Sequence, residues 1–143
     1  MKIYLDNCCF NRPFDDQTQV KIFLETQAKL FIQQGIMDRQ YEFVWSYILE
    51  YENMQNPYEI RRKSIIGWKE LAIYRIVENE LILEYADRLT NMSIKPKDAL
   101  HVACAIYTKC DYFITTDKKL LNFETDDIRI VSPIDFINEV EVK

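Results

Sequence analysis

Four acidic residues are placed so that their side chains can act together. Asp6 and Asp117 each follow an apolar run typical of a β-strand, Asp98 lies in the first turn of an expected helix, and Glu52 follows the run YEFVWS by a few residues. In open α/β sheets, ligands bind beyond the carboxyl ends of the strands. We therefore expect these four acids, here called the acidic cluster, to line one pocket.

Carboxylates gathered in one pocket repel each other unless a cation lies between them. Mg²⁺ and Mn²⁺ prefer oxygen ligands and keep several waters, so they suit a set of acids better than a set of His and Cys. A divalent ion lowers the pKa of its bound water and stabilises charge on a phosphoryl oxygen. The acidic cluster is therefore suited to metal-dependent hydrolysis of a phosphodiester.

The second acid is either Glu50 or Glu52. Residues two apart on an α-helix point roughly 200° from each other, so only one of them lines the pocket. Glu52 shares a helix face with the apolar Ile48 and Leu49, which must face the core. This face argument favours Glu52, and Glu50 stays as the alternative.

Several polar residues beside the acidic cluster have two interpretations each. His101, three residues after Asp98, either donates to a phosphate or a carboxylate or is a half-buried helix residue. Thr115 either holds a ligand or packs within its strand. Asn7 either orients Asp6 or ends the strand through a local turn. Ser46 is suited to cap the helix that carries Glu52.

Basic residues offer a surface for a nucleic acid. Lys97 and Lys118 each adjoin a member of the acidic cluster in sequence and are expected at the mouth of the pocket. Arg61 and Arg62 belong to a basic patch that either contacts RNA or is a solvated helix face.

Composition limits the class of protein. The 143 residues suit one domain (1–143), 48% of them are hydrophobic, and Gly and Pro are scarce. The four cysteines form no CxxC pair and only one His is present, which favours reduced thiols over a zinc site. Two bound divalent ions would change the formal charge from −5 to −1. The N-terminus has no apolar run long enough for a signal or a membrane span, so a cytoplasmic location is expected.

Strands and helices are expected to alternate, which predicts a mainly parallel four- to five-stranded sheet covered by helices on both faces. The expected strands are 2–5, 41–45, 112–116 and 128–131, and residues 11–16 are expected to form a loop. The expected helices are 17–34, closed by Gly35, one following Ser46, 58–72, 80–92, one opening at Pro96, and a short one after Pro133.

Four motifs, in order along the chain, resemble those of the PIN-domain nucleases. They are KIYLD ending at Asp6, SYILEYE from Ser46 to Glu52, DALHVACA from Asp98 to Ala105, and CDYFITTD ending at Asp117. The match covers nearly the whole chain.

The resemblance implies a three-layer α/β/α sandwich and a ribonuclease that depends on Mg²⁺ or Mn²⁺, with the acidic cluster as metal ligands. It also implies a role like that of the toxin in a bacterial toxin/antitoxin pair, with RNA as substrate, an antitoxin protein as partner, and a homodimer as a common assembly. Two alternatives stay open: a module on the same scaffold that binds RNA or protein without cutting, and a nuclease for single-stranded or flap DNA.

Overall fold

The computed structural model describes residues 1–141 and contains one five-stranded sheet. All neighbouring strands pair in parallel, in the order β3-β2-β1-β4-β5. The strands are β1 (Lys2–Leu5), β2 (Glu42–Ser46), β3 (Tyr74–Ile76), β4 (Tyr112–Ile114) and β5 (Arg129–Val131). The sequence predicted four of these strands and their parallel arrangement, and both predictions are confirmed.

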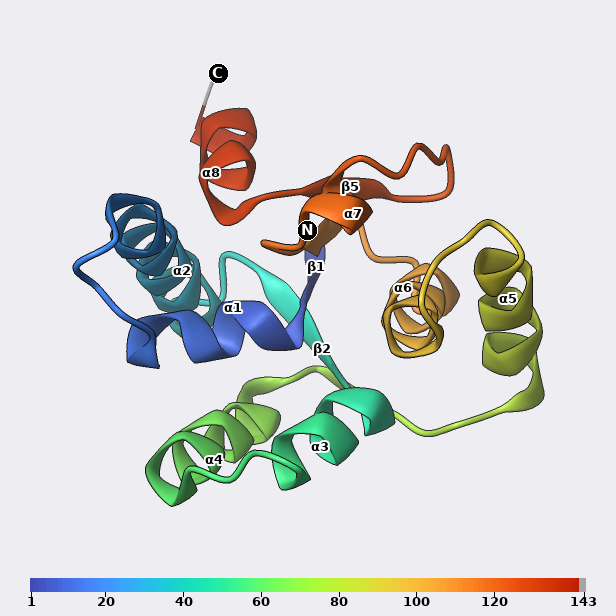
Figure 1. The fold of residues 1–143 in the computed structure, drawn as a ribbon, viewed down its shortest axis with the longest axis horizontal. Helices are drawn as coiled ribbons and strands as arrows, with labels where there is room; N and C mark the ends of the chain where they lie inside the picture. Colours follow the sequence, from blue (N-terminus) through green and yellow to red (C-terminus); the bar gives the residue numbers. More distant parts are fainter. Residues whose placement is uncertain (142–143) are drawn as a thin grey trace.

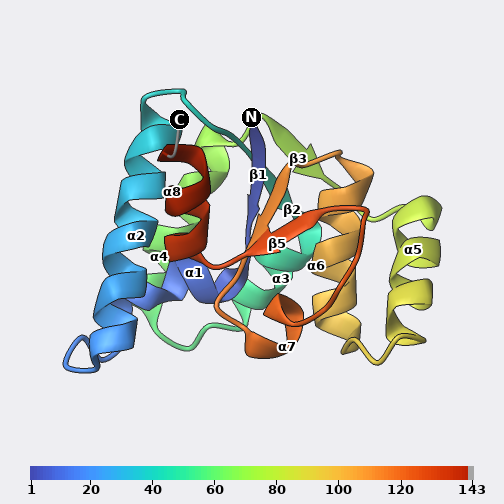
Figure 2. The ribbon, with the colours of Figure 1, turned by 90° about the horizontal axis from the view of Figure 1, so that it is seen from above.

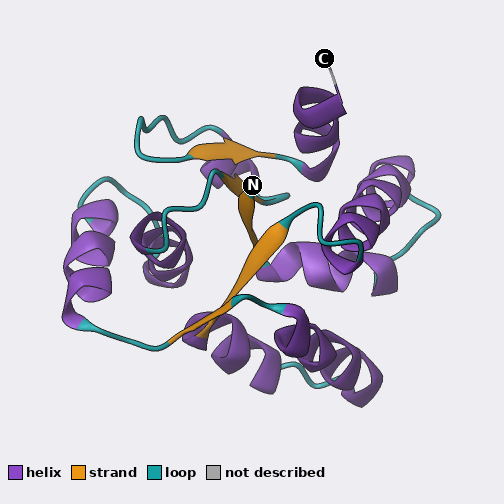
Figure 3. Cartoon of the chain, turned by 180° about the vertical axis from the view of Figure 1, so that it is seen from behind, coloured by secondary structure: helices purple, strands orange, loops and turns teal. Residues whose placement is uncertain are grey.

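Helices cover both faces of the sheet. In Figures 1 and 2, α2 and α8 lie on one side of the strands and α5 and α6 on the other, and Figure 3 shows from behind how helices enclose the sheet. This is the expected three-layer sandwich. The helical segments are α1 (Asn7–Asn11), η1 (Arg12–Phe14), α2 (Val20–Met37), α3 (Tyr47–Met54), α4 (Glu59–Ile66), η2 (Gly67–Leu71), α5 (Glu80–Thr90), α6 (Pro96–Tyr107), α7 (Lys118–Leu121) and α8 (Pro133–Glu141).

The central strands are buried on both faces, as their apolar runs predict. Ile3, Tyr4 and Leu5 of β1 are buried, and so are Phe113 and Ile114 of β4. Hydrogen bonds continue past the end of β1, where the Asp6 N–H donates to the Ile114 carbonyl at 2.9 Å. Since all strands run the same way, the segments that follow them meet at one edge of the sheet.

Local expectations failed in four places. Of residues 11–16, expected as a loop, residues 11–14 belong to α1 and η1, because the Asp6 side chain caps a short helix directly after β1; Asp15 and Asp16 lie outside both. The expected helix 58–72 is divided into α4 and η2. The short edge strand β3 escaped prediction, because its three residues bury little apolar surface. Helix α2 continues through Gly35 to Met37.

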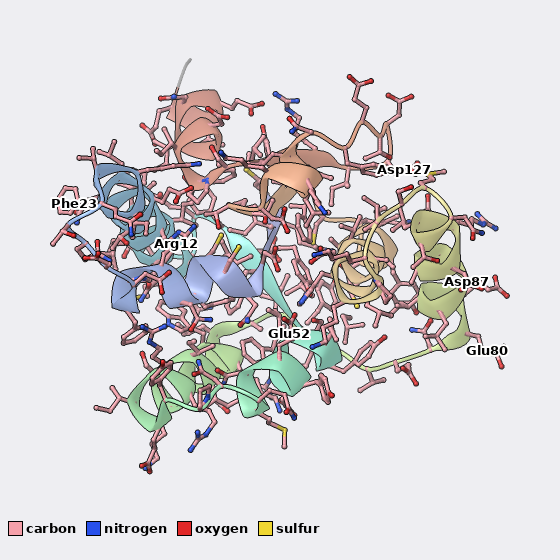
Figure 4. All side chains as sticks on the ribbon, viewed as in Figure 1. Arg12, Phe23, Glu52, Glu80, Asp87 and Asp127 are labelled. Atoms are coloured by element: carbon pink, nitrogen blue, oxygen red, sulfur yellow. The ribbon has the colours of Figure 1, made fainter. Side chains whose placement is uncertain are left out.

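Helix α2 also turns its apolar stripe outward. Five apolar residues that supported its prediction are exposed, whereas Glu25, Lys29 and Ile32 are buried. Figure 4 shows Phe23 on the outer side of this helix. The exposed apolar residues are Val20, Phe23, Leu24, Leu30 and Phe31.

None of the helices within residues 1–141 has both the length and the apolar character that a membrane crossing requires.

Gly35 allows α2 to lie against Tyr41, and this contact predicts a stability effect. A Cβ atom at position 35 would lie 2.6 Å from Tyr41 Cδ2, whereas a Cβ at Gly67 would meet nothing within 4 Å. We expect Gly35→Ala to lower the free energy of unfolding by about 1–3 kcal/mol, because the buried Tyr41 ring must move. Gly67→Ala, the matched control, should be neutral or stabilise by up to about 1 kcal/mol. Urea denaturation measures both, and an unchanged Gly35→Ala midpoint would contradict the packing argument.

Candidate active site

The Asp6 carboxylate is held by donors from α1 and from Thr115, which follows β4. Its Oδ1 accepts the Asn7 N–H at 2.8 Å, which caps α1, and its Oδ2 accepts the Thr115 hydroxyl at 2.8 Å. The Cys8 thiol lies 3.6 Å from the same Oδ2. With 6% of its surface exposed, Asp6 is a buried carboxylate in a fixed orientation. Thr115 therefore acts on Asp6 as well as packing in the sheet.

A hydrogen-bond chain leads from β2 through the core to Glu52. The Tyr4 hydroxyl lies 2.6 Å from Ser46 Oγ and 2.6 Å from His101 Nδ1. The other ring nitrogen, His101 Nε2, is hydrogen-bonded to Glu52 Oε1 and lies 3.9 Å from Asp6 Oδ1. His101 is thus fully buried between Tyr4 and two carboxylates. Figure 4 shows Glu52 near the middle of the molecule, whereas Glu80, Asp87 and Asp127 lie toward its rim.

The pKa values of His101 and Tyr4 in this hydrogen-bond chain depend on burial and on the neighbouring carboxylates. Burial alone would lower the pKa of His101, but the hydrogen bond to Glu52 and the charge of Asp6 raise it above its ordinary value. Burial raises the pKa of Tyr4 far above its usual range, so Tyr4 is a neutral hydroxyl that can donate and accept. Of the two interpretations of His101, the structure favours the residue that holds a carboxylate.

Sequence reasoning missed Tyr4, although its position carries a usable signal. Tyr4 stands two residues before Asp6 on the same strand, and side chains two apart point to the same face of a sheet. Ser46 has the role that the sequence predicted, because its side chain accepts the Leu49 N–H and caps α3.

Asp98 and Asp117 approach from α6 and α7. Burial raises the pKa of Asp98, and the charges of Asp6 and Asp117 raise it further, as expected for carboxylates that share one edge of the sheet. Asp117 caps α7 by accepting the Lys119 N–H at 2.8 Å, while its own N–H donates to Thr115 Oγ1 at 3.1 Å. Glu52 also acts on Asp98 electrostatically. The structure therefore brings the whole acidic cluster to one edge of the sheet.

Glu50 lies on another side of α3. Its carboxylate accepts hydrogen bonds from Lys69 Nζ at 2.6 Å and from Trp45 Nε1 at 3.2 Å. The Lys69 contact lowers the pKa of Glu50. Glu50 is thus engaged in an ion pair away from Asp6 and His101, as the helix-face argument expected.

The side chains of Lys97 and Lys118 are exposed, whereas Asn7 makes hydrogen bonds within α1. Lys97 is exposed with its ammonium 5.8 Å from the centre of the Tyr51 ring, and Lys118 is exposed at the start of α7. Both belong to the first turn of a helix that carries one of the acids. Asn7 accepts a hydrogen bond from Asn11 through its backbone carbonyl at 3.1 Å and a weaker one through its side chain at 3.4 Å.

Arg61 and Arg62 make internal contacts. Arg61 donates to the Phe14 carbonyl at 2.6 Å and forms an ion pair with Asp15 at 3.3 Å. Arg62 donates to the Asn56 carbonyl at 3.0 Å. The Arg61 contacts join α4 to the segment after β1, and the Arg62 contact is with the loop before α4. Both leave less of each guanidinium free for an external phosphate.

The donor set fits a hard divalent cation, because this edge of the sheet offers carboxylate oxygens. Burial and the neighbouring carboxylates raise the pKa of Asp98, and a cation there would offset that cost. Within residues 1–141, no three His, Cys, Asp or Glu side chains are close enough to enclose one ion. An ion bound at this edge would therefore need waters among its ligands, which Mg²⁺ usually keeps. Asp6, Glu52, Asp98 and Asp117 are the residues that would hold such an ion.

A parallel α/β/α sandwich with four carboxylates at the strand ends defines a class of protein suited to metal-assisted phosphodiester chemistry. The family model described as PIN domain matches residues 3–125. The chain therefore belongs to the PIN domain family, a family of nucleases.

Two solved structures share the fold. FitAcB from Neisseria gonorrhoeae superposes with a TM-score of 0.61 at 13% identity, covering 92% of this chain and 98% of that one. VapBC2 from Rickettsia felis, bound to a DNA fragment from their promoter, gives a TM-score of 0.58 at 12% identity and covers 91% and 97%. No curated protein matches the sequence. At these identities the likeness concerns the fold alone.

The uncompensated charge at Asp98 predicts a gain in stability when it is removed. Because the folded-state pKa of Asp98 is raised, its carboxyl group favours folding most below its unfolded-state pKa and loses that effect as pH rises through the folded-state pKa. In EDTA at pH 7, Asp98→Asn should therefore unfold at a higher temperature than the wild type. Solvent screening limits the gain to about 1 kcal/mol or less.

Differential scanning calorimetry between pH 3 and pH 8 tests this prediction. The difference between Asp98→Asn and the wild type should shrink toward acidic pH, where the wild-type carboxyl is already protonated. Asp126→Asn, at an exposed position in the loop before β5, is the control. A variant that is equally stable or less stable at pH 7 would show that Asp98 is compensated within the protein.

Proposed function

We propose that this protein is a divalent-metal-dependent endoribonuclease that acts as the toxin of a toxin/antitoxin pair. The observation that carries the proposal is that the parallel sheet brings Asp6, Glu52, Asp98 and Asp117 to one edge, where burial and the charges of the other three raise the pKa of Asp98. Membership of the PIN domain family supports the nuclease class.

Each acid has a distinct task in this proposal. Bound Mg²⁺ or Mn²⁺ would supply a water of lowered pKa and stabilise charge on the phosphate. Asp6, with both oxygens oriented by the Asn7 N–H and Thr115, provides the most rigid anchor. Glu52 is hydrogen-bonded to the buried His101, and a cation beside Asp98 would offset the burial and carboxylate repulsion that raise its pKa.

RNA as substrate and an antitoxin as partner extend the proposal further. RNA rests on the family resemblance and on the exposed Lys97, Lys118 and Tyr51, which offer cationic and stacking groups beside the acids. The structural likeness to FitAcB and VapBC2, which are toxin–antitoxin complexes, supports an antitoxin partner. Genomic proximity to a gene for a small partner protein would test that part separately.

The first functional prediction concerns Asp6. Asp6→Asn keeps the size of the side chain but removes the charge, so cleavage of RNA oligonucleotides in Mn²⁺ should fall by about 10²–10³-fold or more. Asp126→Asn should keep wild-type rates, and circular dichroism should show that both variants are folded. Parallel digestion of RNA and DNA oligonucleotides identifies the substrate class.

The outcomes of this experiment separate the alternatives. An unchanged rate in Asp6→Asn would refute the assigned site. If calorimetry finds no Mg²⁺ or Mn²⁺ binding at millimolar concentration and no nucleic acid is cut, the chain is a non-catalytic binding module. Cleavage of single-stranded or flap DNA alone would keep the chemistry and replace the substrate.

The second functional prediction distinguishes the two glutamates of α3. We expect Glu52→Gln to weaken Mn²⁺ binding in calorimetry and to slow cleavage by about tenfold or more. Glu50→Gln should leave both unchanged, because Glu50 pairs with Lys69. It is a matched control from the same helix. Equal effects of the two substitutions on metal binding would contradict the assignment of Glu52.

A further inference from the structure

Helix α2 carries a buried ammonium group that lies near Phe10 of α1. Lys29 of α2 is 3% exposed. Its Nζ is hydrogen-bonded to Gln33 Oε1 and lies 5.4 Å and 5.3 Å from the ring centres of Phe10 and Trp68. Burial lowers the pKa of Lys29 to about 8, so the group is still mainly charged at neutral pH.

No carboxylate compensates this charge. Among the described residues, none lies within 4.0 Å of Lys29 Nζ, and the nearest acid along the helix, Glu25, pairs with Arg12 at 3.0 Å. Arg12 also pairs with Asp15, which in turn pairs with Arg61. These two cations and two anions balance each other and leave Lys29 as an unpaired charge. A buried ion without a counter-ion is costly for folding.

Lys29 lines a cavity of about 160 Å³ whose walls combine aromatic and aliphatic side chains with the polar Gln33 and Ser64. Its rim reaches the surface at Leu30 and Ser64, which are exposed. This volume is below that of a typical drug-sized site, so it suits a small molecule. The lining includes Phe10, Phe14, Gln33, Ile65 and Trp68.

We propose that this cavity binds a small organic carboxylate, whose oxygens pair with Lys29 Nζ and the Gln33 side-chain amide while its apolar body lies among Phe10, Phe14 and Trp68. The ammonium group has three N–H donors, of which the described contacts use one, so two are free for an anion. The aromatic side chains beside the ammonium can pack against a hydrocarbon body, which favours an organic carboxylate over the strongly hydrated inorganic phosphate. This inference does not depend on the nuclease proposal, because none of these residues belongs to the acidic cluster.

Binding is tested with sodium benzoate and sodium propionate, using isothermal titration calorimetry of the full chain in EDTA. We expect at least one of these carboxylates to bind with a Kd of the order of 1 mM or tighter. Benzamide, which has the shape of benzoate without its charge, should bind about tenfold more weakly or worse. Equal binding of benzamide, or binding of inorganic phosphate alone, would overturn the assignment of a carboxylate site.

Substitution of Lys29 distinguishes a ligand-binding cation from a structural one. Lys29→Met keeps the length of the side chain and removes the charge, so the ligand-free variant should unfold about 2–5 °C above the wild type and lose carboxylate binding. Lys21→Met, at an exposed position of the same helix, should change neither property. A Lys29→Met variant that unfolds at a lower temperature, or that still binds benzoate, would show that the aromatic contacts alone explain the buried ammonium.

Discussion

Repulsion between carboxylates is the constraint on which the candidate site depends. The parallel sheet brings the ends of β1, β2 and β4 to one edge, and each of these strands leads into a segment that carries an acid. The fold therefore concentrates negative charge by its topology alone, and this charge must be stabilised by hydrogen-bond donors or by a cation. Asp6 shows the first solution, since a backbone N–H and a threonine hydroxyl satisfy its two oxygens. Asp98 illustrates the need for a cation, because burial and the neighbouring carboxylates raise its pKa.

Hydrogen bonds to other side chains distinguish the two glutamates of α3, of which only Glu52 joins the acidic cluster. Glu52 and Glu50 are two residues apart on α3, and their partners separate them: His101 engages Glu52, while Lys69 and Trp45 engage Glu50. His101 can do so because Tyr4 holds its other nitrogen, and Ser46 holds Tyr4 while it caps α3. One chain of contacts thus fixes the start of α3, a side chain of β1 and a member of the acidic cluster. The position of Glu52 is coupled to the packing of the sheet.

The sequence predicted the elements with strong local signals. Continuous apolar runs located β1 and β4, Ser46 and Pro96 marked helix starts, and the periodicity of α3 pointed to Glu52. Where the outcome depended on contacts distant in sequence, prediction failed. The 3.6-residue pattern of α2 is real, yet the apolar stripe faces outward, because a second apolar set on the other face, Ala28, Ile32 and Ile36, packs into the core. Tyr4 looked like an ordinary core residue, since its hydroxyl meets His101 only across 97 positions.

Asp6 and Lys29 illustrate two ways in which a buried charge can be explained. Both are almost fully buried and both lie beside α1, but Asp6 receives hydrogen bonds from an N–H and a hydroxyl, whereas Lys29 has one amide oxygen and two ring faces. Folding alone would favour an apolar residue at position 29, because nothing described in the chain balances that ammonium. Charges that weaken the folded state tend to be retained where they act on something outside the chain. By this reasoning, the charges at Asp98 and Lys29 support the two proposed sites, one for a cation and one for an anion.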